Sequence, residues 1–186
     1  QAKRVSEALA NIGSPLPLEA TERLSDLAME SLDETTVQKI QQIIDPYCLA
    51  IIIINPEARV KVENGPAKAE LVQEGWKTFL VKIHNEANLT ANFDVESPNA
   101  YPILHKSSNQ HRMIEENTLS NGQIDNRFLE VAIYRDRPMQ QNLSGLELEY
   151  AVIQLYTRVN GKREAKLSFN AGPGTEDIGF RNAIDI

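Results

Sequence analysis

Hydrophobic residues in the first 45 positions recur at helical spacing. Val5, Leu9 and Ile12 lie three or four residues apart and predict a helix. Residues 13–17 contain one glycine and two prolines and end that pattern. A second helix is predicted over residues 18–31, with Leu24, Leu27 and Ala28 on one face.

A third helix is predicted between Asp33 and Pro46. Asp33 is a good N-cap residue, and Pro46 cannot continue a helix. The apolar stripe of this helix consists of Val37, Ile40 and Ile44. Because short amphipathic helices are marginal alone, all three are expected to dock on another part of the protein.

From Tyr47 onward the hydrophobic pattern has a period of two, which is typical of half-buried strands. The apolar run CLAIIII predicts a fully buried strand. The alternating segments are 60–63, 79–84, 92–96, 129–133 and 165–169. Asn160-Gly161 predicts a hairpin turn, and residues 85–88 predict a second one.

Many short antiparallel strands joined by turns indicate a mainly β fold, an antiparallel β-sandwich of the jelly-roll kind. Two regions follow from the change of period: a helical N-terminal segment over residues 1–45 and a β-sandwich domain over residues 46–186.

The final residues, 175–186, read as a strand and not as a polar tail. We expect Phe180 and Ile184 to be buried, Ile186 to pair with a neighbouring strand, and the natural chain to continue. The first residue is Gln1 and not Met, so signal-peptide cleavage and trimming are both open explanations.

Charge and composition exclude several classes of partner. The net charge of −7 argues against nucleic acid, which requires a basic surface. No apolar run is long enough to span a bilayer. Cys48 is the single cysteine, so no internal disulfide forms, and its place in an apolar run predicts a buried, unreactive thiol.

The polar stretch 97–126 lacks periodicity and is the first candidate for binding. Tyr101, His105 and His111 are its candidate ligand-binding residues. Two histidines can share a metal, but no third ligand stands at a recognised spacing, so surface histidines are the simpler interpretation. No metal, no cofactor and no catalytic residue is predicted.

Other polar positions are interpreted as ordinary surface. Glu147 and Glu149 share one face of a predicted strand, which favours a solvated pair over acid–base chemistry. His84 and Lys82 are expected to be solvent-facing neighbours. Trp76 opens a strong strand and is interpreted as core or edge packing.

Two stretches, residues 45–100 and 143–186, resemble a known family. The most specific pieces are INPEARVKV, GPAKAELVQEGW, FLVKIHNEA, GKREAKLSF and DIGFRN. They are similar to the N-terminal β-rich region of large exported proteins of planctomycetes and similar bacteria. Those proteins carry a metallohydrolase domain of the CehA/McbA, PHP-like type downstream. The resemblance implies an accessory region, and none of the hydrolase's metal-binding motifs occurs here.

We therefore expect a non-catalytic accessory module of an exported, periplasmic or extracellular protein. It would dock or present the downstream domain of the same polypeptide or bind a partner. The alternative is a carbohydrate-binding module, which requires a concave face with Tyr101, Tyr134 or Trp76 exposed. A third hypothesis makes the chain a metal-dependent enzyme that acts through His105, His111 and nearby acids, which metal analysis would test.

Overall fold

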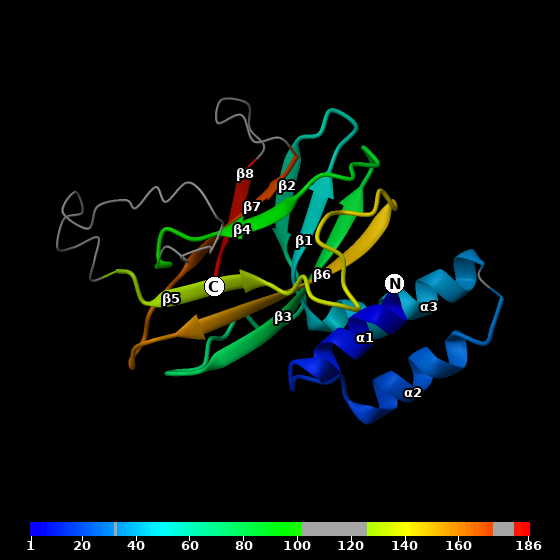
Figure 1. The fold of residues 1–186 in the computed structure, drawn as a ribbon, viewed down its shortest axis with the longest axis horizontal. Helices are drawn as coiled ribbons and strands as arrows, with labels where there is room; N and C mark the ends of the chain where they lie inside the picture. Colours follow the sequence, from blue (N-terminus) through cyan, green and yellow to red (C-terminus); the bar gives the residue numbers. More distant parts are fainter. Residues whose placement is uncertain (32, 102–125, 173–180) are drawn as a thin grey trace.

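The computed structural model describes residues 1–31, 33–101, 126–172 and 181–186, with backbone alone for residues 181–185 (Figure 1). Three α-helices precede the strands: α1 (Ala2–Asn11), α2 (Leu18–Leu27) and α3 (Glu34–Ile44), followed by a 3₁₀ turn, η1 (Asp45–Tyr47). The strands are β1 (Cys48–Ile54), β2 (Val60–Asn64), β3 (Trp76–Asn85), β4 (Phe93–Glu96), β5 (Leu129–Ile133), β6 (Leu148–Thr157), β7 (Lys166–Ala171) and β8 (Arg181–Asp185).

The helices follow the sequence pattern closely, with two corrections. The Asp33 carboxylate accepts a hydrogen bond from the Thr36 N–H at 2.8 Å, which confirms the predicted cap of α3. The second helix ends at Leu27 and not at residue 31. On α3 the predicted Val37 is exposed, because the buried side of the helix is formed by Thr36, Ile43 and Ile44.

Five strands form one mixed sheet in the order β2-β1-β3-β6-β5. The prediction of antiparallel pairing is wrong for β1 and β3, which run parallel. Since β2 pairs along one edge of β1, the chain crosses to the opposite edge through residues 65–75. Gly65 permits this crossing, because a side chain there would collide with the carbonyl group of Cys48.

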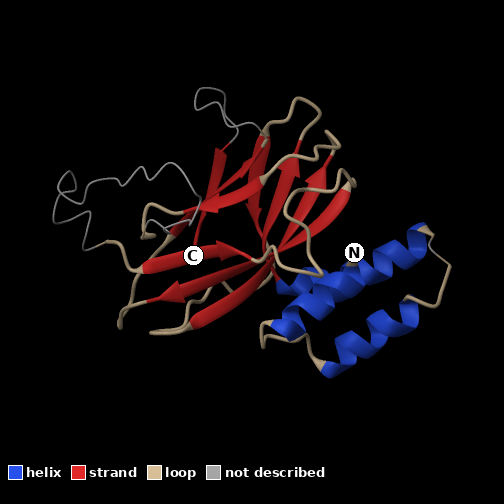
Figure 2. Ribbon diagram, in the orientation of Figure 1, coloured by secondary structure: helices blue, strands red, loops and turns tan. Residues whose placement is uncertain are grey.

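The remaining strands form a three-stranded antiparallel sheet in the order β4-β7-β8. Both predicted hairpins are therefore wrong. The turn at Asn160-Gly161 joins β6 of the large sheet to β7 of the small one, and residues 85–88 join β3 to β4. These turns carry the chain from one sheet to the other (Figure 2).

Alternation along the strands creates two hydrophobic cores. Phe79, Val81 and Ile83 of β3 belong to a core that also contains Phe93 and Phe169 of the small sheet. Leu80 of β3 and Tyr150 and Val152 of β6 belong to a second core, with the helices. We call this second side of the large sheet the helix-side face. The fold is mainly β, as predicted, with helices packed on this face.

Candidate functional site

The helices cover only one end of the helix-side face. A ten-residue helix such as α1 is about 15 Å long, whereas a ten-residue strand such as β3 is about 33 Å long. In Figure 1 the helices lie beside one end of β3 and β6, and the other ends extend past them together with β5. The end outside the helices begins at Trp76, whose exposed fraction is 54%.

A row of side chains crosses this uncovered end, perpendicular to the strands. Trp76 of β3 lies directly opposite Tyr156 of β6, and Tyr156 lies opposite Glu130 of β5. The Trp76 and Tyr156 ring centroids are 5.1 Å apart with an interplanar angle of 46°. The two rings therefore pack against one another at an angle, and Trp76 is the exposed member of the pair.

The row continues beyond β5 through an ion pair to a third ring. Arg158 Nε donates to Glu130 Oε1 at 2.7 Å, and the Arg158 guanidinium lies 4.4 Å from the centroid of the Tyr101 ring. The Tyr101 N–H donates to the Leu129 carbonyl at 2.9 Å, so this residue lies beside β5 as a further strand would. We call Trp76, Tyr156, Glu130, Arg158 and Tyr101 the aromatic row.

A second row of smaller side chains separates the aromatic row from the helices. Thr78, Gln154 and Ala132 pair across the same three strands and are half-buried. A cavity of about 180 Å³ lies next to Thr78, and its opposite wall is the α1–α2 connection, residues 14–17. At the uncovered end, Thr78, Gln154 and Ala132 therefore lie between the aromatic row and the α1–α2 connection, which contains Pro15 and Pro17.

The covered end of the same face holds a buried polar cluster. Lys82 Nζ donates to Asp45 Oδ2 at 2.6 Å and to Gln41 Oε1 at 2.8 Å, and the Tyr150 hydroxyl donates to Asp45 Oδ1 at 2.8 Å. Lys82 is only 6% exposed, so the prediction that it faces solvent is wrong. The cluster ties the junction after α3 to β3 and β6.

Burial raises the pKa of two side chains at this end, the Cys48 thiol and the Tyr150 hydroxyl. It raises the pKa of the Cys48 thiol to about 12, and the nearby Asp45 carboxylate adds to the rise. Burial, followed by the hydrogen bond to Asp45, also raises the pKa of the Tyr150 hydroxyl. A thiol that stays protonated is unreactive, so the prediction for Cys48 as a buried, inert residue is supported by its position.

His84 continues the same face beyond Lys82 and is half-buried, not solvent-facing as predicted. Burial lowers the pKa of its imidazole, and the Lys82 charge lowers it further. A histidine in this environment is held in its neutral form at neutral pH.

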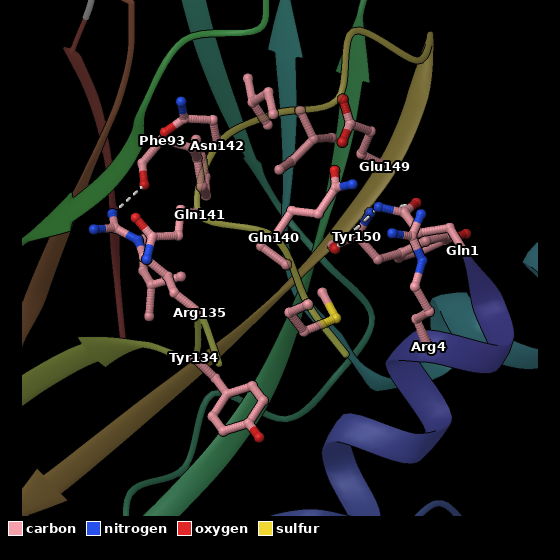
Figure 3. A pocket seen from close by; sticks show the side chains of 15 residues that line it. Gln1, Arg4, Phe93, Tyr134, Arg135, Gln140, Gln141, Asn142, Glu149 and Tyr150 are labelled. Carbon is pink, nitrogen blue, oxygen red and sulfur yellow. Dashed lines mark hydrogen bonds between the residues drawn. The ribbon is translucent and has the colours of Figure 1, made fainter. Parts of the chain in front are cut away.

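A small cavity opens between α1, β6 and residues 134–143 (Figure 3). Its volume is about 40 Å³, enough for a few water-sized molecules and too small for a cofactor. The Gln1 amide accepts from the Tyr150 N–H at 3.1 Å, and Arg135 donates to the Phe93 carbonyl at 2.8 Å. These lining groups are engaged in holding the fold together.

Glu149 at the edge of this cavity is 4% exposed, which contradicts the prediction of a solvated carboxylate pair. Its carboxylate accepts from the Ser144 N–H at 2.9 Å, the Ser144 hydroxyl at 2.9 Å and the Gly145 N–H at 3.2 Å. Because these donors come from the loop before β6, Glu149 anchors that loop and is not free for acid–base chemistry.

A wider groove of about 690 Å³ lies on the other side of the large sheet, between residues 69–73 and the β6–β7 turn. Phe128, Val159 and Ile186 line it. Ile186 exchanges hydrogen bonds of 2.8 and 3.1 Å with Ala165, which confirms its predicted strand pairing. Phe180 and the Ile184 side chain lie outside the described residues, so their predicted burial stays a prediction.

The structure brings together only part of the predicted site. Tyr101 lies in the aromatic row, where it contacts Arg158. His105 and His111 lie outside the described residues. Tyr134 is half-buried, and its hydroxyl donates to the Arg137 carbonyl at 3.2 Å. Trp76, interpreted as packing, is the exposed ring instead.

Sequence reasoning missed Tyr156, Arg158 and Glu130. The sequence signal was weak: Glu130 lies between the apolar Leu129 and Val131, whereas Tyr156 has one apolar neighbour, Leu155. Finding the row also required the pairing of β5 and β6, which are 14 residues apart in sequence and joined by an irregular segment. That pairing is not visible in a hydrophobic pattern.

Among the described residues, no cluster of three or more histidine, cysteine, aspartate or glutamate side chains has a geometry that could hold a metal ion. No helix in the described part of the chain has the length and apolar character required to cross a bilayer.

Comparisons with known proteins return no relationship. No protein-family model matches the chain, no curated protein matches it, and no solved structure matches it. The resemblance to the N-terminal region of exported CehA/McbA-bearing proteins therefore stays a prediction.

Proposed function

We propose that this chain is a non-catalytic accessory module of a larger exported protein and that it binds a partner through the aromatic row. The observation that supports this proposal is Trp76, which is 54% exposed and packs at a tilt against Tyr156 where the helices end. Aromatic and arginine side chains dominate binding surfaces, because they bury much area with little loss of conformational freedom.

In this proposal the two sheets act as a β-sandwich scaffold that holds the row rigidly. The core side chains of both sheets pack into one cluster, and the row is built on regular strands and not on loops. Side chains on paired strands keep their spacing, which suits a surface that must match a partner.

A carbohydrate-binding module is the second candidate. The sign required for it was a concave face with an exposed ring; Trp76 is exposed, whereas Tyr101 and Tyr134 are half-buried. Fold architecture adds nothing to this candidate, because sandwich folds host many unrelated functions.

Two observations test the accessory role. The complete reading frame should encode an export signal before Gln1 and a further domain, of the metallohydrolase type, after Ile186. A stop codon directly after Ile186 would contradict it. Hydrogen–deuterium exchange, measured on the full-length protein and on this chain alone, tests whether the aromatic row is covered. Peptides that contain Trp76 and Tyr156 should exchange more slowly in the full-length protein.

A further inference from the structure

Resting on the proposed function, we infer that the aromatic row is a binding site for a neutral oligosaccharide chain. The oligosaccharide would lie across β3, β6 and β5, perpendicular to the strands. Three features of the row carry this inference: its ring surface, its balanced charge and its length.

The ring surface suits the apolar side of a sugar ring. A pyranose presents C–H groups on its faces and hydroxyl groups at its rim. Trp76, which is 54% exposed, offers ring surface for those C–H groups, and Tyr156 packs beside it at a tilt, with 5.1 Å between the ring centroids. Tyr101 provides a second ring at the other end of the row, with Arg158 over it.

Charge in the row is balanced. Arg158 and Glu130 neutralise one another, and their side chains remain 48% and 31% exposed. A guanidinium has five donors and a carboxylate about four acceptor positions, so the pair keeps groups available for hydroxyls on both sides. An anionic ligand would find no net positive charge in the row, and the chain as a whole carries −7.

The length of the row favours an oligosaccharide over a single sugar as the ligand. Trp76, Tyr156, Glu130 and Tyr101 occupy four adjacent strand positions, which span about 14 Å at the usual separation of strands. A ring stands at each end of the row, with the hydrogen-bonding groups of Glu130 and Arg158 between them. The half-buried row of Thr78, Gln154 and Ala132 borders the same path and adds further polar atoms.

Trp76 is the single tryptophan of the chain, so intrinsic fluorescence reports directly on the row. Titration with cellohexaose, xylohexaose and mannohexaose should shift the emission to shorter wavelength and saturate with at least one of them. Electrophoresis through native gels containing hydroxyethyl cellulose, arabinoxylan or galactomannan provides a second readout. Polygalacturonate gels supply the anionic comparison.

Variants test whether slower migration in the glycan gels depends on the aromatic row. Trp76→Ala should weaken binding at least 10-fold, Tyr156→Ala and Tyr101→Ala several-fold, and Trp76→Tyr should retain part of the affinity. Leu146→Ala is the matched control, because Leu146 is 50% exposed and lies outside the row, and it should bind as the unaltered protein does. Circular dichroism verifies that each variant is folded.

Several outcomes would overturn the inference. They are no fluorescence shift or retardation with any neutral glycan, retardation by polygalacturonate alone, and equal effects of Trp76→Ala and Leu146→Ala. A dimer in sedimentation that Trp76→Ala dissociates would identify a second copy as the occupant instead.

The hydrogen–deuterium exchange experiment distinguishes failure of the oligosaccharide inference from failure of the proposed accessory role. If neutral glycans do not bind but the full-length protein protects Trp76 and Tyr156, the row is a protein interface and the proposed function stands. If the row is neither protected nor bound by glycans, both proposals fall.

Discussion

The two ends of the helix-side face are built from the same strands and have opposite environments. At the covered end, Leu80 and Val152 are buried under the helices and Lys82 is satisfied by Asp45 and Gln41. At the uncovered end, Trp76 is exposed and Tyr156 is half-buried. Strand pattern alone therefore does not decide burial, since the length of the covering helices sets the boundary.

Removing apolar volume should have very different effects at the two ends. Leu80→Ala should lower the free energy of unfolding by about 3 kcal/mol, because it leaves a cavity in a packed core. Trp76→Ala should lower it by less than about 1 kcal/mol, since most of that ring already contacts water. Urea unfolding followed by circular dichroism measures both, and similar losses would contradict the boundary.

Breaking the buried polar cluster should have the next largest effect. Lys82→Met should lower the free energy of unfolding by about 2 kcal/mol, because Asp45 loses its charge partner while partly buried. The double variant Lys82→Met with Asp45→Asn should recover part of that loss. Lys61→Met is the matched control, since the Lys61–Glu63 pair is exposed and should contribute at most about 0.5 kcal/mol.

The Tyr150 hydroxyl tests the same cluster with a smaller change. Tyr150→Phe removes one hydrogen bond of 2.8 Å to Asp45 and should lower the free energy of unfolding by about 1 kcal/mol. Tyr134→Phe removes the more exposed bond to the Arg137 carbonyl and should cost less than half as much. An equal cost in the two variants would show that burial does not strengthen the Tyr150 bond.

His84 should make the stability of the covered end depend on pH, and this effect should be the smallest. Burial and the Lys82 charge lower the pKa of folded His84 below its unfolded value of about 6.5. The unfolded state therefore binds the proton more tightly, so this stability is fully present above pH 6.5. It is lost as pH falls from there through the folded pKa.

Urea unfolding at a series of pH values measures this effect. His84→Gln should lose less stability than the unaltered protein over that window, and parallel curves for the two would refute the assignment. The difference between the two curves isolates His84 from carboxylates such as Asp33, whose pKa is also lowered.

The helices and several strands of this protein follow from local patterns in its amino-acid sequence. The helical spacing of Val5 and Leu9, the Asp33 cap and the period of two in β3 and β5 are local properties, and each appears in the structure. The mainly β character, the buried Cys48 and the strand at Ile186 follow from the same local preferences.

Only the tertiary structure decided which elements pair and where water is excluded. The Asn160-Gly161 turn joins two sheets, β1 and β3 pair in parallel, and Lys82 finds its partners Gln41 and Asp45 in a segment 41 and 37 residues earlier in the chain. The aromatic row exists because β3, β6 and β5 align Trp76, Tyr156 and Glu130 beyond the reach of three short helices. Contacts between residues far apart in the chain depend on register and coverage, which a pattern of hydrophobic positions does not contain.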